Sequence, residues 1–360
     1  MLLGLPRSFE RAYKSCSFVP TFAPVFLRDS AMKLPRRKFL RLAAGAAALP
    51  AITCVASAET YPARPIRLVV PFPPGGAFDA VARPWVEKMK PLLGTIIIEN
   101  IGGGGSSLGA AAVVRARPDG YTILLGGTLT HINEALLKTR PLYDPVKDLD
   151  PISSVAVSAF VLAVNPSVPA RSLKEFAAYA KAQSVKISYA HPGIGSLPQL
   201  IGELFKSLAG LPDMVQVPYR GAGPAINDLI GGQVQMSVMA LTGQVIGFHR
   251  SGKLRVLAMT GPVRAVAAPE FPTAAESGFP GLTAQMTLGV LAPAGTPKQI
   301  IEQIAQANQT ALTERAYQDF LIEDGFEPAP DTNPEKFRRT LEQDVALWRP
   351  VVEGLGLKID

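Results

Sequence analysis

IRLVVPFPPGGAFDAVARPWVEKMKPLL, residues 66–93, joins two structural patterns across one turn. Its first seven residues, IRLVVPF, are apolar with little alternation, which is typical of a strand buried on both faces. The prolines and glycines of PFPPGG end the strand, and residues 77–93 have a helical pattern. A buried strand, a turn and a helix form the repeating unit of an α/β protein.

The same unit recurs along the chain after residue 59. Further strands are predicted in the segments TIIIEN, YTILLGG, VKISYAH, MVQVPYR, VQMSVMA and LRVLAMTG. Further helices are predicted at 173–183, 199–209 and 224–229, and two C-terminal helices begin at Thr296-Pro297 and Asn333-Pro334. Strands that alternate with helices favour parallel sheets with both faces covered, so the predicted fold class is α/β.

Two long apolar segments have no helix between their halves. They are ISSVAVSAFVLAVNP at 152–166 and LTAQMTLGVLAPAG at 282–295. A long strand of this kind can leave one sheet and enter another, so the pair predicts a body of two domains. We place the first domain at 59–159 plus 288–360 and the second at 160–287. A chain of 360 residues is long enough for both.

Residues 1–58 differ in composition from the rest of the chain. They hold nine Lys/Arg and two Asp/Glu, which leaves 27 bases and 27 acids in residues 59–360. The net charge of +7 therefore belongs to this leader, and the balanced remainder gives no support to a nucleic-acid partner. Both cysteines, Cys16 and Cys54, also lie in the leader, so no disulfide is expected in a mature protein without it.

The leader has the pattern of an export signal. Arg36-Arg37 precedes an apolar stretch at 42–55, and the small residues Ala56-Ser57-Ala58 form a cleavage site. We expect a twin-arginine signal peptide that is cleaved after Ala58, and a periplasmic mature protein. Either Met1 or Met32 is the start. A membrane anchor is the less favoured alternative, because a spanning helix needs about 20 apolar residues.

Glycine-rich turns follow several predicted strands, at 74–79, 126–130, 191–196 and 219–223. In parallel α/β domains such turns lie at the carboxyl ends of the strands, where ligands bind. Glycine lets the backbone approach a ligand, and the next helix begins with unpaired N–H groups that can hold a carboxylate or phosphate. Alternatively, each glycine only permits a tight turn. Four such turns across two facing domains favour a cleft for a small anion.

Asp79 stands in the first of these turns, just inside a predicted helix start. An acid at that position can cap free N–H groups and interact favourably with the helix dipole. Alternatively, its carboxylate receives an amino group, a hydroxyl or a bridging water of a ligand. The sequence leaves both interpretations open.

Signatures of enzymes are weak. GSSLG at 105–109 matches G-x-S-x-G, but four glycines separate Ser107 from the preceding strand, so an exported α/β hydrolase using Ser107 is a less favoured alternative. His131, His191 and His249 lack the spacing of metal ligands, and no nucleotide-binding signature is complete, so no metal or cofactor is expected. His191 lies in a glycine-rich turn and can donate a hydrogen bond to a ligand. His249 is expected to be a solvated residue at a helix end.

Longer motifs occur in the order found in one family. They are YPARPIRLVVPFPPGGAFDAVAR, PDGYTILLG, YDPVKDLDPIS, VNPSVPARSLKEFAAYAK, VPYRGAGPAINDLIGGQV and LAPAGTP. With them the chain resembles the extracytoplasmic solute receptors of tripartite tricarboxylate transporters, the Bug-type receptors. The resemblance implies a type II periplasmic-binding-protein-like fold, in which two α/β domains close on a ligand by hinge motion near 158–162 and 286–290. It also implies a receptor that is not an enzyme and that delivers a small carboxylate to a membrane permease.

The resemblance also assigns ligand-binding residues by motif. The first ligand loop contains Gly75, Gly76, Phe78 and Asp79, the facing loop contains Gly193, Gly195 and Ser196, and further walls are Thr128, Tyr219, Gly221 and Ala222. Together with His191, these are the predicted site residues.

Three positions depart from the family's common pattern. Phe78 stands where a small hydroxyl residue is frequent, Pro198-Gln199 replaces a frequent histidine, and Met239-Ala240-Leu241 replaces a stretch that often carries an acid. These changes disfavour amino-acid ligands and favour a less polar carboxylate, such as an aromatic one. A further alternative has the same binding chemistry, with the loaded protein acting as a co-receptor for a membrane sensor instead of a permease.

Overall fold

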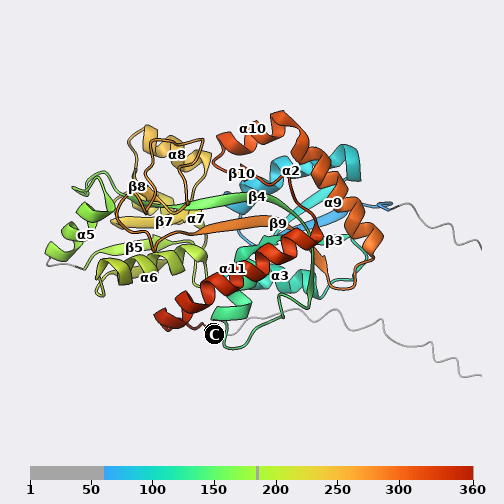
Figure 1. The fold of residues 1–360 in the computed structure, drawn as a ribbon, viewed down its shortest axis with the longest axis horizontal. Helices are drawn as coiled ribbons and strands as arrows, with labels where there is room; N and C mark the ends of the chain where they lie inside the picture. The colour runs from blue at the N-terminus through green and yellow to red at the C-terminus, as the bar shows by residue number, and fades with distance from the viewer. Residues whose placement is uncertain (1–60, 184–185, 360) are drawn as a thin grey trace, which may run out of the picture. The chain divides into compact units, whose positions relative to one another are not determined.

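The computed structural model describes residues 61–183 and 186–359 (Figure 1). The predicted leader, with its twin arginines, both cysteines, cleavage site and two candidate starts, lies outside the described residues. In the described part, helices cover both faces of a mixed sheet. The α/β fold class predicted from the sequence is confirmed.

The first part of the sheet is parallel and buried. Its elements are β1 (Ile66–Val70), α2 (Ala77–Leu93), β2 (Ile96–Asn100), η1 (Gly104–Ser106), α3 (Ser107–Val114), β3 (Thr122–Gly127), α4 (Thr128–Ile132) and η2 (Asn133–Leu137). β1 lies between β2 and β3 and is parallel to both. Leu68 belongs to the hydrophobic cluster that contains α2, whereas Val69 packs with the alanines of α3. Because helices cover both faces, β1 is apolar except at Arg67, which forms an ion pair with Glu99 of β2.

The other end of the sheet repeats this unit. Its elements are α5 (Leu173–Ala182), β5 (Ser188–His191), α6 (Leu197–Ala209), β6 (Val215–Pro218), α7 (Ala222–Ile230), β7 (Met236–Ala240), α8 (Gly243–Arg250) and β8 (Arg255–Met259). β5 is parallel to β6 and β7. α6 ends at Gly210, which adopts a left-handed conformation with φ of 64°. A residue other than glycine is strained in that conformation.

Two long strands connect the two ends. β4 (Leu149–Val164) and β9 (Gln285–Pro293) run antiparallel beside each other across the middle of Figure 1. β9 also pairs with β3, and the second half of β4 pairs with β7 and β8. The strand order is β2-β1-β3-β9-β4-β7-β5-β6. The parallel pairing predicted for strands that alternate with helices is found between β1 and its neighbours β2 and β3 and between β5 and its neighbours β6 and β7. β4 and β9, whose directions were not predicted, are antiparallel to each other.

The C-terminal elements are α9 (Lys298–Thr313), α10 (Arg315–Glu323), β10 (Glu327–Pro328) and α11 (Pro334–Leu355). α11 begins at the predicted Asn333-Pro334 signal, where Asn333 Oδ1 accepts the backbone N–H of Lys336 at 2.8 Å. The helix contacts β4, β9 and α4 and also α6, so it reaches both ends of the sheet.

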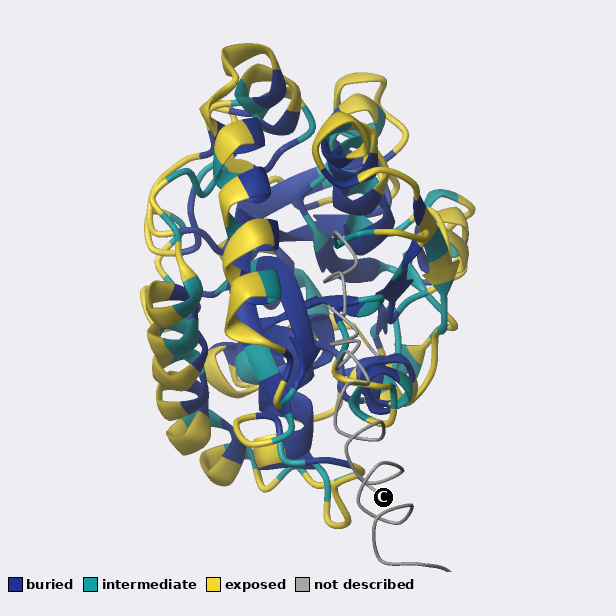
Figure 2. Cartoon of the chain, turned by 90° about the vertical axis from the view of Figure 1, so that its right-hand side faces the viewer, coloured by how far each residue is buried: buried dark blue, intermediate teal, exposed yellow. Residues whose placement is uncertain are grey.

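The sequence did not predict α3, α4 or α10, and of α8 it predicted only the C-terminal end at His249. The sequence of α3, SLGAAAVV, is apolar or small on every side and so has no helical periodicity. Figure 2 shows the buried strands in dark blue between helices whose outward faces are yellow. Within the described ranges, no helix combines the length and apolar character of a membrane-spanning segment.

Candidate functional site

Three helices start at the wall of one small cavity. Gly76 and Ala77 at the start of α2, Ser196 before α6, and Gly221 and Ala222 at the start of α7 all line it. The cavity has a volume of about 60 Å³, and we call it the inner compartment. Because the positive ends of three helix dipoles meet there, the inner compartment favours a negative charge.

The first N–H groups of two of these helices are free to bind a ligand. Ala77 and Phe78 in α2, and Ala222 and Gly223 in α7, have no acceptor for their backbone N–H among the described residues. The first turn of any helix leaves such groups unpaired. An anion in the inner compartment therefore meets unsatisfied donors from two separate parts of the chain.

The remaining walls of the inner compartment are apolar. They include the side chains of Phe72, Phe78, Leu129, Phe160 and Met286. The ring centroids of Phe72 and Phe78 lie 4.7 Å apart. Ser196 has the one polar side chain among the described residues that line this cavity, and its hydroxyl donates to the carbonyl of Gly193 at 2.7 Å.

A larger cavity of about 680 Å³ adjoins the inner compartment, and we call it the outer compartment. The two share Phe72, Pro73, Pro192 and Gly221 as lining residues. Pro73 and Gly221 are neighbours there, because a Cβ added to Gly221 would be in ordinary contact with Pro73 Cγ at 3.6 Å.

The outer compartment is more polar than the inner one. The four glycines at 102–105, together with Asn100, line one side, and Ile194, Tyr219 and Arg220 line the other. Arg220 is exposed and has no ion-pair partner among the described residues. The outer compartment therefore has a free cationic side chain, which the inner compartment lacks.

The predicted site residues fall into four groups, of which two line the inner and outer compartments. Gly76, Phe78, Ser196, Gly221 and Ala222 line the inner compartment. Gly193 and Tyr219, and again Gly221, line the outer one. The Tyr219 hydroxyl donates to Asp228 Oδ2 at 2.7 Å, and burial together with Asp228 raises the pKa of Tyr219 to about 12, so the phenol stays neutral.

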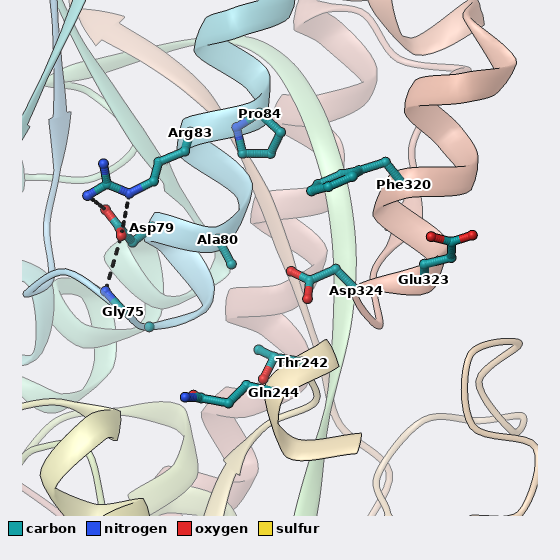
Figure 3. Close-up of a pocket in the computed structure, with 11 residues that line it drawn as sticks. Gly75, Asp79, Ala80, Arg83, Pro84, Thr242, Gln244, Phe320, Glu323 and Asp324 are labelled. Atoms are coloured by element: carbon teal, nitrogen blue, oxygen red, sulfur yellow. Dashed lines mark hydrogen bonds and ion pairs between the residues drawn. The ribbon is translucent and has the colours of Figure 1, made fainter. Parts of the chain in front are cut away.

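Gly75 and Asp79 lie at a different cavity, of about 480 Å³, which Gly76 also lines; we call it the rear pocket. Figure 3 shows it between the start of α2, residues Thr242 and Gln244 at the start of α8, and Phe320, Glu323 and Asp324 at the end of α10. The turn before α2 therefore has the inner compartment on one side and the rear pocket on the other.

The Asp79 carboxylate is engaged by the protein itself. It accepts the backbone N–H of Gly75 at 3.1 Å and Nε of Arg83 at 2.8 Å, as Figure 3 shows, and Asn100 Nδ2 lies 3.4 Å away. Burial raises the pKa of Asp79, but these hydrogen bonds outweigh it and hold the pKa below its usual value. The ionised carboxylate thus fixes the turn that precedes α2.

Thr128, His191 and Gly195 do not line any of these three cavities. Thr128 is fully buried, and its hydroxyl accepts the N–H of Thr287 at 2.8 Å. His191 is fully buried with Nδ1 2.9 Å from the Gly193 carbonyl, and burial lowers its pKa. Gly195 donates its N–H to the Gln199 side chain at 2.7 Å. These contacts fix the loops around the inner compartment.

Ser107 has no catalytic environment. It is 1% exposed at the start of α3, and its hydroxyl donates to the carbonyl of Gly104 at 2.9 Å. None of the three histidines is among its hydrogen-bond partners in the described part. A nucleophilic serine of this type stands directly at a strand end, whereas η1 separates β2 from α3 here. The hydrolase interpretation is wrong.

The prediction that His249 is solvated holds only in part, because the residue is half-buried. Its Nδ1 accepts the N–H of Val256 at 3.0 Å, and its ring lies edge-on to Phe271 with centroids 4.8 Å apart. The His249 ring therefore packs against β8 and Phe271, although Arg250 and Ser251 beside it are exposed. Among the described residues, no group of three or more His, Cys, Asp or Glu side chains is placed to hold a metal ion.

Sequence reasoning missed much of the cavity wall. Phe72, Leu129, Phe160 and Met286 in the inner compartment, and Arg220 in the outer one, were not predicted site residues. Phe160 and Met286 lie on the two crossover strands, within the predicted hinge segments 158–162 and 286–290. A hinge between two domains that close on a ligand also borders the cleft between them. The predicted hinge segments could therefore have identified these two wall residues.

Comparison with known proteins identifies close relatives. The sequence pattern of the tripartite tricarboxylate transporter family receptor matches residues 81–357. The chain is similar to the periplasmic binding protein BugD, with 34% sequence identity and a TM-score of 0.78. The similarity covers 83% of this chain and 99% of BugD.

Two similar proteins of known structure from Rhodopseudomonas palustris contain ligands. MatC, with bound malate, is 31% identical with a TM-score of 0.76, and the match covers 81% of this chain and 100% of MatC. Rpa4515, with adipate, is 30% identical with a TM-score of 0.79, and the match covers 83% of this chain and 99% of Rpa4515.

Proposed function

This chain belongs to the receptor family of the tripartite tricarboxylate transporters, and we propose on that premise that it captures a small carboxylate in the inner compartment for a membrane permease. It is a periplasmic solute-binding receptor of the Bug type and not an enzyme. The ligands of MatC and Rpa4515, malate and adipate, support a carboxylate as the ligand class.

The convergence of helix N-termini carries this proposal. Unpaired N–H groups from α2 and α7 border one cavity, and no acidic side chain of residues 61–183 or 186–359 lines it. A hydrogen bond to a charged group contributes about 1.5–3 kcal/mol, and a helix N-terminus adds up to about 2 kcal/mol in a partly buried site. These donors favour the ionised carboxylate over a neutral ligand.

The residues around the inner compartment take different roles in this proposal. Gly76, Phe78, Ser196, Gly221 and Ala222 contact the ligand, and Gly193 and Tyr219 border its entrance. Gly75, Asp79, Thr128, His191 and Gly195 position the loops through the hydrogen bonds described above.

Binding is coupled to closure of two domains, which we place at 59–159 plus 288–360 and at 160–287. A carboxylate that contacts Ala77 of one domain and Ala222 of the other is bound best when the domains are close, so it favours the closed form. β4 and β9 connect the domains, and the hinge lies near 158–162 and 286–290. We also propose that the leader directs export through the twin-arginine route.

A single substitution tests the role of the helix N-termini. Ala222→Pro removes one of the unpaired N–H groups, and proline at the first position of a helix preserves the helix. Arg315→Pro is the matched control, because Arg315 begins α10 and likewise has no acceptor for its N–H among the described residues. Ala222→Pro should weaken carboxylate binding at least tenfold, whereas Arg315→Pro should leave it unchanged.

A thermal-shift screen of mono-, di- and tricarboxylates identifies the ligand for that comparison. A ligand that binds only the folded protein stabilises it by about 2.7 kcal/mol at a concentration of 100 Kd. Failure of every carboxylate to raise the melting temperature would refute the proposed function. Equal affinity of Ala222→Pro and the wild type would refute the role of the α7 N-terminus.

A further inference from the structure

The inner compartment offers ligand donors without any cationic side chain. Its donors are backbone N–H groups of α2 and α7, and no lysine, arginine or histidine lines it among the described residues. The Ser196 hydroxyl already donates to the carbonyl of Gly193. One carboxylate is therefore accommodated at the helix N-termini, but a second one would be buried without a partner, which is strongly unfavourable.

An amino group is equally disfavoured in the inner compartment. No aspartate or glutamate lines it among the described residues. Asp79 lines the rear pocket instead, and its carboxylate is bonded to Arg83 and Gly75. An α-amino acid would therefore lose the hydration of its ammonium group and gain no counter-charge.

The size of the inner compartment limits the apolar part of the ligand. Its volume of about 60 Å³ corresponds to roughly four to six water-sized groups, since a water needs about 10–15 Å³. An engineered cavity that binds benzene has about 150 Å³. The paired rings of Phe72 and Phe78 fill space that an aromatic ligand would need. The inner compartment therefore favours a short aliphatic carboxylate over the aromatic one expected from the sequence.

The outer compartment offers an alternative site for the second carboxylate of a ligand. Arg220 there has no ion-pair partner among the described residues and could receive the second carboxylate of a long diacid. Such a ligand would have to extend past Pro73 and Gly221, which line both compartments. A short ligand needs no more than the inner compartment.

On the basis of the proposed function, we infer that the ligand is a short-chain aliphatic monocarboxylate, such as propionate or butyrate. Its carboxylate lies at the N-termini of α2 and α7, and its methyl end contacts Phe78 and Met286. Those two side chains are the specificity-determining residues, because they occupy the space in which a dicarboxylate would carry its second charge.

Calorimetric titration with a matched set of four-carbon ligands tests this inference. Butyrate, 2-aminobutyrate, succinate and malate share a chain length and differ in one or two polar groups, and adipate and benzoate extend the set in length and width. We expect butyrate to bind at least tenfold more tightly than each of the others. Equal or tighter binding of succinate, malate, adipate or benzoate would overturn the inference and leave the proposed function intact. Binding of none of the six would overturn the inference, whereas the proposed function would be overturned only if the whole carboxylate screen also failed.

Single-residue variants test whether Phe78 and Met286 determine the ligand specificity. Phe78→Ser should weaken butyrate binding at least fivefold and narrow its advantage over malate, whereas Phe78→Leu, which stays apolar, should change butyrate binding by less than threefold. Met286→Ser should reproduce the effect of Phe78→Ser and serves as the second variant if the first fails to fold. Arg220→Ala should leave butyrate binding unchanged. A tenfold loss in Arg220→Ala would place the ligand charge in the outer compartment and overturn the inference.

Discussion

The backbone N–H of Thr287 donates to the hydroxyl oxygen of Thr128 at 2.8 Å, and the same hydroxyl donates to Asp344. Thr128 begins α4, Thr287 lies in the crossover strand β9, and Asp344 belongs to α11. One side chain therefore joins three elements beside the proposed hinge. Its position in the fold explains why Thr128 is fully buried.

The free energy of unfolding of the protein should depend on pH through Asp344. Burial raises the pKa of Asp344 from 3.8 to about 6, although the hydrogen bond from Thr128 opposes the shift. The folded protein thus binds this proton more tightly than the unfolded chain. The contribution of Asp344 to the free energy of unfolding should therefore fall as the pH rises from about 4 to about 6, by on the order of 3 kcal/mol.

Asp344→Asn removes this titration and keeps a side chain that can bond Thr128. We expect the variant to be more stable than the wild type at pH 7.5 and to show a weaker loss of stability between pH 4 and pH 6. Urea unfolding across that range measures both effects. Identical pH profiles for the two proteins would mean that Asp344 titrates normally.

Asp79 should matter more for stability than for ligand contact. Asp79→Ala removes hydrogen bonds to Gly75, Arg83 and Asn100, and we expect a loss of about 1–3 kcal/mol. Arg83→Ala is the control; its side chain is 60% exposed, so we expect a loss below about 1 kcal/mol. Because the pKa of Asp79 lies below 3.8, its contribution persists above pH 4 and is lost in stronger acid.

Ligand titration of the same variants separates the two interpretations of Asp79. We expect affinity to fall less than fivefold in Asp79→Ala, because the carboxylate lines the rear pocket and not the inner compartment. Loss of binding with unchanged stability would instead identify Asp79 as a ligand contact.

Export should require the arginine pair of the leader. The twin-arginine route distinguishes arginine from lysine, so Arg36→Lys combined with Arg37→Lys should leave an uncleaved precursor inside the cell. Arg41→Lys keeps the pair and should be exported normally. Cell fractionation with mass spectrometry of the mature N-terminus, expected at Glu59, measures the outcome. Normal export of the double variant would exclude this route.

Local signals were sufficient for much of the fold. The bounds predicted for the helix at 77–93 agree with those of α2, and Asn333-Pro334 marks the start of α11, because turns and caps act over a few residues. The directions of β4 and β9 were not predicted, since strand pairing depends on residues far apart in the sequence. The walls of the inner compartment were not predicted for the same reason, because they depend on the pairing of distant strands.

Glycine motifs pointed to the turns around the inner compartment but not to its walls. Phe160 and Met286 meet there only because β4 and β9 pair, and each alone is an ordinary apolar strand residue. Asp79 illustrates the opposite case. Its position in the sequence was informative, yet only its contacts with Gly75 and Arg83 show which side of the turn its carboxylate occupies.

The last prediction concerns closure, and two adjacent glycines allow a controlled test. Gly104 and Gly105 have φ of 59° and 67°, so alanine strains the backbone similarly at either position. A Cβ on Gly105 would lie 2.8 Å from the carbonyl oxygen of Ile194 in the facing loop and 2.6 Å from Asn133 Nδ2. A Cβ on Gly104 would meet Ser107 alone, at 3.3 Å.

Gly105→Ala should therefore hold the two loops apart and weaken ligand binding at least tenfold, whereas Gly104→Ala should weaken it less than threefold. Small-angle scattering at saturating ligand should give a larger radius of gyration for Gly105→Ala than for Gly104→Ala, because only the former obstructs closure. Equal affinities in the two variants would show that the approach of residues 105 and 194 is not needed for binding. In that case the ligand would be held without closure of the two domains, and the helix N-termini of α2 and α7 would act on it independently.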